Sequence, residues 1–328
     1  MWNFPLAPEQ ASQEAAGYDA LFWVISALTV FFTVVVMTFV IIFAIKYRVG
    51  SRANRDRITH DSGKIEFAWT MPPLVLALAI FAWGARDFVH SRKPPENAME
   101  LFVIGKQWMW HVQHQNGVRE NNEMHVPLGV PVKVTMISQD VLHALYLPAF
   151  RVQRHVEPGQ YTQMWFTPSK PGRYYMFCAM HCGTQHSEMG GYVYVMPQDE
   201  YATWLANGGN KIAPPQRNMV QSGERLFKQL QCGSCHGPAD TPRGPSLYNV
   251  AGKTVTLANG KTVEADDRYL RNSIVRPYAE LVKGYIQTMP ENYKDQLTEE
   301  QILHLLAYMK TLGVAPAADS NASTVTRS

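Results

Sequence analysis

Two long apolar segments stand near the start of the sequence. From Leu21 to Ile45 every residue is apolar or is a small Ser or Thr, and as a helix rising about 1.5 Å per residue this run reaches roughly 37 Å. A second run extends from Phe67 to Ala85 and carries Pro72 and Pro73 near its start, where a helix loses least from a missing N–H. Both runs are long enough to cross a bilayer, so the pattern predicts a hairpin of two transmembrane helices.

Two alternatives fit these runs less well. A buried core helix would be shorter and would show a polar face, and a secretory signal peptide would carry basic residues before the first run, where only Glu9, Glu14 and Asp19 are charged.

The flanking charges give this hairpin an orientation. The loop between the runs is basic; its positive charges are Lys46, Arg48, Arg52, Arg55, Arg57 and Lys64. The positive-inside rule places this loop in the cytoplasm, so both chain ends and everything after about residue 90 are expected outside.

The overall composition agrees with a membrane protein. Charged residues make up 17 % of the 328 residues, below the roughly 25 % usual in soluble domains. The formal net charge of +3 is too small and too dispersed to indicate a nucleic-acid partner.

A β-sandwich is predicted for residues 96–205. Short alternating or aromatic-rich runs recur there, separated by Pro and Gly. The runs are MELFVI (99–104), QWMWHVQHQ (107–115), PVKVTMI (131–137), QYTQMWFTP (160–168), RYYMFC (173–178) and GYVYVM (191–196). We expect them to pair as antiparallel strands, with the last two bracketing the loop CAMHCGTQHSEMGG.

This loop concentrates soft metal ligands. Cys178, Cys182, His186 and Met189 follow one another at spacings of four, four and three. Two thiolates, an imidazole and a thioether favour copper over magnesium or calcium, whereas a Cys/His set without the thioether would favour zinc. A mononuclear blue-copper site needs a single Cys. Two bridging thiolates instead suit two copper ions, and His143 is the candidate for the second imidazole.

Some alternatives remain open at this point. Cys178 and Cys182 could form a disulfide in an oxidising compartment, His181 competes with His186, and Met180 competes with Met189. The remaining histidines of the region are expected to be solvated or hydrogen-bonded; they are His111, His114, His125 and His155.

A haem-binding domain is predicted for residues 218–312, after a linker at 206–217 that is rich in Gly, Pro and Asn. Its motif C-x2-C-H attaches a c-type haem through the thiols of Cys232 and Cys235, and the adjacent His236 binds the iron. Met289 is the preferred sixth ligand because Pro290 keeps its segment in a loop. We expect Met309 and His304 to be residues of a C-terminal helix, Met219 to be structural, and residues 313–328 to be a loose tail.

The segments GKQWMW, DVLHALYLPAFR and YYMFCAMHCGTQHSEMGG, behind the hairpin, resemble subunit II of haem-copper cytochrome c oxidases. The resemblance covers nearly all of residues 15–205 and implies a cupredoxin domain with a binuclear copper A centre. The ligands it implies are His143, Cys178, Cys182, His186, Met189 and the main-chain carbonyl of Met180. Where this chain has Met180 the family has a Glu that helps to hold magnesium, which puts that interfacial cation in doubt.

Two further roles follow from the resemblance. Trp108 matches the aromatic residue through which electrons enter the copper centre. Glu66, in IEFAWTMPP, matches the glutamate at the entrance of a proton path into subunit I.

Residues 218–312 resemble class I, all-α cytochromes c through GERLF, CGSCH, GPSL and TMP, and the fusion as a whole resembles bacterial caa3-type oxidases. The expected domains are therefore a membrane segment (1–95), a copper A domain (96–205), a linker, a cytochrome c domain (218–312) and a tail. We expect a bacterial plasma-membrane protein that passes electrons from haem, by way of Trp108, to copper and then to subunit I for oxygen reduction coupled to proton transport. Fusion would make the haem–copper encounter a tethered one, at an effective concentration on the order of mM.

The expected partners are subunits I and III, and a quinol-oxidising complex or a cytochrome c as the donor. Two other functions share parts of this pattern. A nitric oxide reductase can use the same electron carriers, since the chemistry lies in the catalytic subunit. A Sco-like copper chaperone would have a thioredoxin-like fold and one span, and would need neither a haem nor His186 and Met189.

Overall fold

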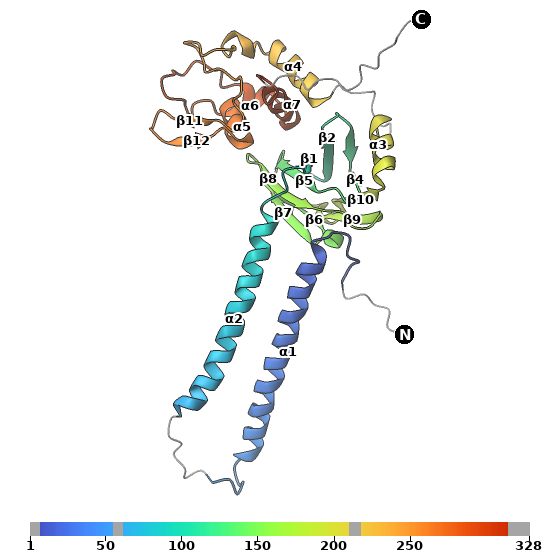
Figure 1. Ribbon diagram of the computed structural model, residues 1–328, viewed down its shortest axis with the longest axis vertical. Helices are drawn as coiled ribbons and strands as arrows, with labels where there is room; N and C mark the ends of the chain where they lie inside the picture. Colours follow the sequence, from blue (N-terminus) through green and yellow to red (C-terminus); the bar gives the residue numbers. More distant parts are fainter. Residues whose placement is uncertain (1–6, 55–61, 210–217, 314–328) are drawn as a thin grey trace, which may run out of the picture.

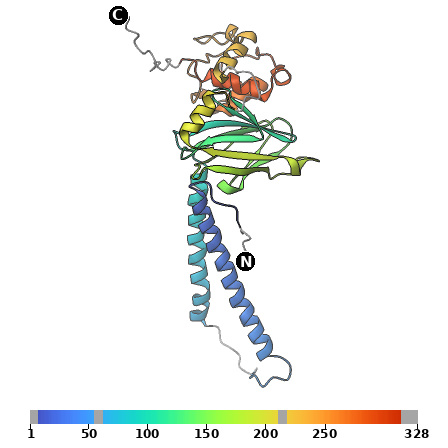
Figure 2. The ribbon, with the colours of Figure 1, turned by 90° about the vertical axis from the view of Figure 1, so that its right-hand side faces the viewer.

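The computed structural model describes residues 7–54, 62–209 and 218–313. A helical hairpin, a β-sandwich and a mainly helical domain follow one another along the long axis, with the helical domain at the end away from the hairpin (Figures 1 and 2). Parts of three expected segments lie outside the described residues: Arg55 and Arg57 of the basic loop, linker residues 210–217, and the tail from 314 onward.

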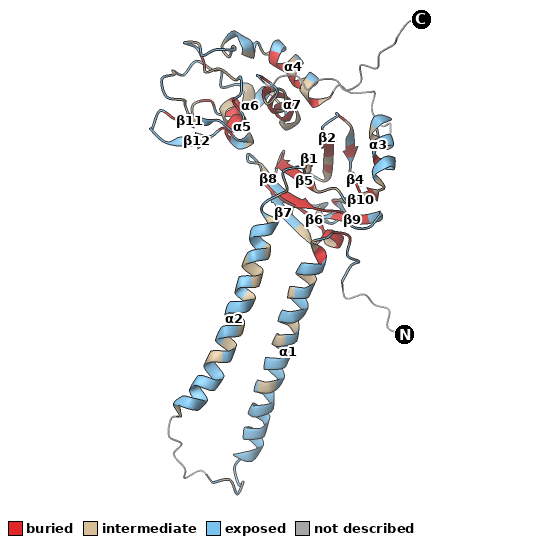
Figure 3. Ribbon diagram, viewed as in Figure 1, coloured by how far each residue is buried: buried red, intermediate tan, exposed pale blue. Residues whose placement is uncertain are grey.

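The hairpin consists of α1 (Ala15–Lys46) and α2 (Gly63–Ser91), both long and apolar enough to cross a membrane. Their side chains are exposed along almost the whole length (Figure 3), as expected of surfaces that lipid or other membrane helices would cover. The start of the hairpin is fixed to the sandwich, where the Ala11 N–H donates to the Ala149 carbonyl at 2.8 Å.

Pro72 and Pro73 lie inside α2 rather than near its start, so that part of the prediction was wrong. The polar residues before the apolar run continue the helix back to Gly63, and helix geometry does not require those first turns to be apolar. In a membrane helix, neighbouring groups satisfy the carbonyls that proline leaves unpaired.

Ten strands form the predicted sandwich. The first sheet has the order β3 (Arg119–Asn121), β2 (Met109–His114), β1 (Met99–Lys106), β5 (Val132–Ser138) and β8 (Thr162–Phe166). The second has the order β4 (Glu123–Pro127), β10 (Gly190–Met196), β9 (Gly172–Cys178), β6 (His143–Leu147) and β7 (Val152–Val156).

The sandwich is not wholly antiparallel, in contrast to the prediction. β1 pairs with β5 in parallel, and so does β10 with β4. Parallel pairing needs a long connection between the two strands, and long segments rather than hairpin turns connect these strands in the sequence. Alternate residues such as Leu101 and Val103 fill the core between the sheets. Four strands were not predicted: β3, β4, β6 and β7. They have only three to five residues each, which is too short for a periodic pattern to stand out in the sequence.

After α3 (Gln198–Ala206), the C-terminal domain contains α4 (Met219–Gln229), α5 (Asp267–Val275), α6 (Tyr293–Gln296) and α7 (Glu299–Met309). The domain was expected to be all-α, but it also contains a small β-hairpin formed by β11 (Thr254–Thr256) and β12 (Thr262–Glu264). Helices α4 and α7 cross at Gly223, where a Cβ atom would lie 1.9 Å from the carbonyl oxygen of His304. Only glycine permits this close crossing.

Candidate metal and haem sites

The loop between β9 and β10 brings the predicted copper ligands together. Cys178 ends β9 and Met189 directly precedes β10, while His143 is the first residue of β6, which pairs with β9. At Gly191 a Cβ atom would lie 2.0 Å from the Asn122 carbonyl oxygen. This glycine therefore allows the end of the loop to pack closely against the turn between β3 and β4.

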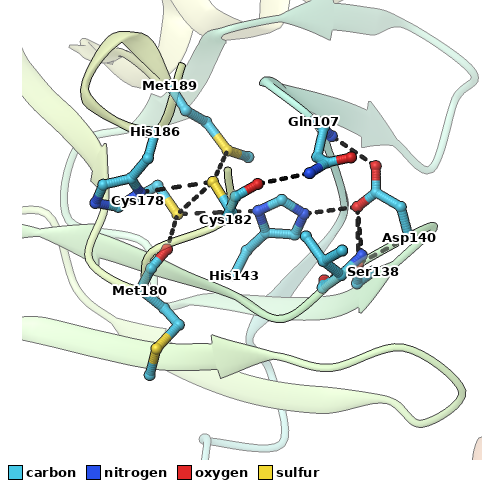
Figure 4. Close-up of polar contacts among 10 residues, drawn as sticks. Gln107, Ser138, Asp140, His143, Cys178, Met180, Cys182, His186 and Met189 are labelled. Carbon is cyan, nitrogen blue, oxygen red and sulfur yellow. Dashed lines mark hydrogen bonds and ion pairs between the residues drawn. The ribbon is translucent and has the colours of Figure 1, made fainter. Parts of the chain in front are cut away.

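The donor atoms converge on one point (Figure 4). The two cysteine Sγ atoms lie 3.9 Å apart, and His143 Nδ1 is 3.9 Å from Cys178 Sγ. His186 Nδ1 is 3.5 Å and Met189 Sδ is 3.6 Å from Cys182 Sγ. The Met180 carbonyl oxygen lies 3.2 Å from Cys178 Sγ. A cluster of six donors is thus present before any ion is considered.

The sulfur separation decides between two readings of the cysteine pair. Both cysteines are free, and their 3.9 Å separation far exceeds the roughly 2.0 Å of a disulfide. With metal–thiolate bonds of about 2.3 Å, two sulfurs can contact the same ion up to about 4.6 Å apart. The separation therefore allows both thiolates to bridge, and the soft donor set fits copper.

The two thiols differ in acidity. Burial raises the pKa of Cys178, but hydrogen bonds from His143 and from the backbone at Ala144 and Met180 outweigh burial and lower this pKa to about 6. Burial and the neighbouring Cys178 thiolate raise the pKa of Cys182 to about 11. Like-charge repulsion thus opposes a second thiolate, and a cation between the sulfurs would relieve it.

Two residues that the sequence did not single out hold the ligands in place. Asp140 Oδ1 lies 2.8 Å from His143 Nε2, which leaves Nδ1 facing the sulfurs. The other Asp140 oxygen accepts from the Gln107 N–H at 2.7 Å. The Gln107 amide donates to the Cys182 carbonyl at 2.6 Å. Asp140 could have been found as the acid three residues before His143, and Gln107 as the residue beside Trp108.

The competing candidates lie elsewhere. His181 is exposed, and the Met180 side chain points away from the two sulfurs (Figure 4). His114 and His125 both hydrogen-bond to buried Glu120. Burial raises the pKa of Glu120, but these two histidines lower it to about 2. This second acid–histidine group is therefore internally satisfied.

Trp108 packs against the copper loop. A Cβ atom at Gly183 would lie 3.3 Å from its indole ring, and Trp108 itself is half-buried. Glu66 lies far from this loop, exposed in the first turn of α2. The structure thus places Trp108 beside the copper ligands and Glu66 at the opposite end of the hairpin.

The C-terminal domain encloses a cavity of about 680 Å³ whose lining includes Cys232, Cys235, His236 and Met289. His236 Nδ1 lies 2.8 Å from the Pro245 carbonyl oxygen, so this nitrogen donates and Nε2 is left for a metal. At Gly244 a Cβ atom would lie 2.8 Å from the His236 ring. The GPSL segment therefore fixes the orientation of His236.

Met289 is held through its backbone, since the Tyr278 hydroxyl donates to its carbonyl at 2.7 Å. Met309 also lines the cavity but lies in α7. Met219 and His304 are buried outside the cavity, at the contact with the sandwich. A mainly apolar cavity with two adjacent thiols, an oriented imidazole and a thioether fits a c-type haem.

Comparisons with known proteins agree with this architecture. The family "Cytochrome C oxidase subunit II, periplasmic domain" matches residues 114–195, and the family "Cytochrome c" matches residues 220–313. The cytochrome c oxidase subunit 2 of Alkalihalophilus pseudofirmus is 26 % identical over 308 residues, covering 89 % of this chain and 88 % of that protein.

Two further comparisons concern a relative and a solved structure. The cytochrome c oxidase subunit 2 of Bacillus sp. strain PS3 is 23 % identical over 292 residues, covering 81 % of this chain and 79 % of that protein. The crystal structure of the periplasmic domain of subunit II of cytochrome oxidase of Bradyrhizobium japonicum is 28 % identical, covers 37 % of this chain and all of that one, and has a TM-score of 0.35.

The fold and the two sites define a membrane-anchored redox protein with a cupredoxin-like domain and a cytochrome domain. The resemblance stated from the motifs is confirmed: the chain combines a cytochrome c oxidase subunit II periplasmic domain with a C-terminal cytochrome c domain, as in a caa3-type fusion. The two matches imply copper A and haem c as cofactors.

Proposed function

We propose that this chain is the subunit of a respiratory haem-copper terminal oxidase that receives electrons and passes them to the catalytic subunit. One electron at a time would go from haem c to copper A and on to subunit I, where oxygen is reduced to water and protons are transported. The chain is thus part of an oxidoreductase whose oxygen site lies in another subunit.

The convergence of the donors in the β9–β10 loop carries this proposal. His143, Cys178, Cys182, His186, Met189 and the Met180 carbonyl would hold two copper ions. Both thiolates are near enough to bridge, and each sulfur has its own imidazole, His143 at Cys178 and His186 at Cys182. Two ions held by such a pair of bridging thiolates could share one electron.

The haem would be held covalently by Cys232 and Cys235, with His236 and Met289 as axial ligands. A His/Met pair gives haem a high reduction potential, which suits a donor to a respiratory copper centre. Trp108, packed on the copper loop, is proposed as the residue through which electrons enter the copper centre.

We further propose the location and the partners of the chain. Residues 1–95 would anchor it in the bacterial plasma membrane, and the copper domain (96–205), the linker (206–217), the cytochrome domain (218–312) and both termini would lie on the periplasmic side. Subunit I, and beside it subunit III, would cover the exposed faces of α1 and α2. Glu66 would stand at the entrance of a proton path, and a quinol-oxidising complex or a cytochrome c would supply the electrons.

Metal analysis with electron paramagnetic resonance tests the copper assignment. We expect two copper ions per haem c and a multi-line mixed-valence copper signal. One copper ion with a blue absorption band, or zinc in its place, would refute the binuclear site.

A turnover assay tests the identity of the acceptor. The complex purified through this subunit should consume oxygen in an oxygen electrode and should consume nitric oxide far more slowly. The opposite ratio would assign the chain to a nitric oxide reductase.

A further inference from the structure

The cytochrome domain rests on the outer face of the first sheet. Leu101 and Val103 of β1 face the sandwich core, so Phe102 and Ile104 point to the opposite side. They are nevertheless only 6 % and 7 % exposed, because they form one buried cluster with Ile137 of β5, Met219 of α4 and Leu303 of α7. These five residues, which we call the seat, join two domains that the linker separates in sequence.

Polar groups surround the seat and are paired across it. The Gln113 side chain of β2 and the His304 ring of α7 are both buried and lie 2.8 Å apart. Arg119 of the sandwich forms an ion pair with Glu300 of α7. On the other side, Arg271 of α5 donates to the Gly159 carbonyl at 2.9 Å. The buried groups among these, Gln113, His304 and Arg271, favour one orientation of the domain, since another orientation would leave them without these partners.

The protonation state of His304 agrees with this contact. Burial, together with the positive charges of Arg119 and Arg225, lowers the pKa of His304 to about 4. The ring is therefore neutral at pH 7, although Glu300 lies 3.9 Å away, and its Nε2 can accept the Gln113 amide N–H. A neutral ring suits a contact whose centre is apolar.

The contact also reaches the core of the cytochrome domain. Tyr161, in the turn between β7 and β8, packs against the seat and against the hydrophobic core of that domain. Leu270 and Leu305 of the same core line the haem cavity. The same turn also contacts the segment that leads to the proposed copper ligand His143. The Ser138 N–H, five residues before His143, donates to the Glu157 carbonyl at 3.1 Å.

The seat ends before Lys106, the next outward-facing residue of β1 after Ile104, because Lys106 and Gln107 are both exposed.

We propose that the cytochrome domain works from this fixed seat and does not swing freely on its linker. This inference rests on the proposed function, because it concerns where the haem donor stands relative to the copper centre. The occupant of the seat is the chain's own α4–α7 face, held by apolar burial and by the Gln113–His304 and Arg119–Glu300 pairs.

Electron cryo-microscopy of the purified complex tests the seat directly. In the native protein, and in a variant with about 15 Gly and Ser residues inserted into 210–217, we expect the cytochrome domain at the same place against Phe102 and Ile104. The variant Leu303→Asp should lose this density and keep its covalent haem spectrum. The matched control Thr311→Asp adds the same charge at an exposed position beyond α7 and should keep the domain seated.

The rate at which flash-reduced haem is reoxidised by copper gives a second measurement. A seated domain predicts a rate that changes less than twofold on linker insertion, whereas a swinging tether predicts a fall of about threefold, from the −3/2 power of linker length. A cytochrome domain found away from the seat or at no fixed place in the native complex, or a seat unaffected by Leu303→Asp, would overturn the proposal. Missing copper or haem spectra would instead contradict the proposed function, so the two failures are distinguishable.

Discussion

The copper loop and the haem cavity collect their ligands in opposite ways. The six copper donors come from one short loop and the adjacent strand start, and their atoms already lie 3.2 to 3.9 Å from a cysteine sulfur. The proposed haem ligands lie far apart in the sequence of their domain, His236 shortly after α4 and Met289 shortly before α6, and both line a cavity of about 680 Å³.

The two sites also differ in what keeps their ligands in position. The copper ligands are positioned by paired strands and by the Asp140 and Gln107 hydrogen bonds, so the loop keeps its form through the sandwich. The cytochrome domain instead surrounds a mainly apolar cavity of about 680 Å³ next to its hydrophobic core. A bound haem would therefore complete the hydrophobic core of that domain, whereas the core of the sandwich is filled by side chains, with Cys178, Cys182 and Met189 among them.

Removal of the haem attachment should produce the largest effect. In the double variant Cys232→Ala/Cys235→Ala we expect the cytochrome domain to lose its cooperative thermal transition and most of its amide protection against hydrogen exchange. The copper domain should keep its copper signal and its own transition. Calorimetry and hydrogen exchange on the full chain measure both domains at once.

The matched control removes copper with a chelator from the unchanged chain. Because the sandwich core is complete without metal, both thermal transitions should persist. A cytochrome domain that stays folded without haem, or a sandwich that unfolds without copper, would reverse the comparison.

Loss of one bridging thiolate should change the copper site but not the fold. Cys182→Ser is nearly isosteric, so the free energy of unfolding of the metal-free protein should change by less than about 1.5 kcal/mol. We expect the copper content to fall from two ions to at most one and the multi-line signal to disappear. His181→Ala, at an exposed neighbour, is the control and should leave two copper ions; loss of copper there would make His181 a ligand.

The sequence predicted the local features of both sites better than the long-range ones. The spacing of Cys178, Cys182, His186 and Met189 on one loop follows from the sequence, because two flanking strands determine where that loop begins and ends. The hairpin and the sandwich were predicted from apolar runs and their periodicity, and the helical C-terminal domain was predicted from its C-x2-C-H motif and the resemblance that its motifs carry; all three are confirmed. The parallel pairing of β1 with β5 could not be predicted from the sequence of either strand alone, since it depends on how the segments between them fold.

The supporting residues were missed for a similar reason. Asp140 and Gln107 are ordinary polar residues in the sequence, and their role appears only where the fold brings two segments 33 positions apart into hydrogen-bonding distance. The outward-facing residues Phe102 and Ile104 are apolar, which could have predicted that the outer face of this strand is covered. A strand buried on both faces reads as a continuous apolar run, and LFVI in β1 is such a run.

A change of the sixth haem ligand should have a smaller effect, confined to the potential. Met289→His should keep the covalent haem and lower its reduction potential, because an imidazole stabilises ferric iron better than a thioether does. Met309→Leu is the control: it conserves volume, should cost less than about 1.5 kcal/mol of stability, and should leave the potential unchanged. Redox titration followed in the visible spectrum measures both. A shift with Met309→Leu and none with Met289→His would exchange the two roles.

The smallest expected effect concerns the support of the copper ligand His143. Asp140→Asn keeps an oxygen that can accept the Gln107 N–H but removes the negative charge 2.8 Å from His143 Nε2. A carboxylate partner makes a ligating imidazole more basic and so stabilises the oxidised centre. Its loss should raise the copper potential by no more than about 60 mV, a tenfold change in a one-electron equilibrium. The multi-line signal should persist, and Gln139→Ala at the exposed neighbour should change neither property. Loss of copper in Asp140→Asn would show instead that the loop depends on this carboxylate to keep its form, which would bring the copper site closer to the haem site in its need for support.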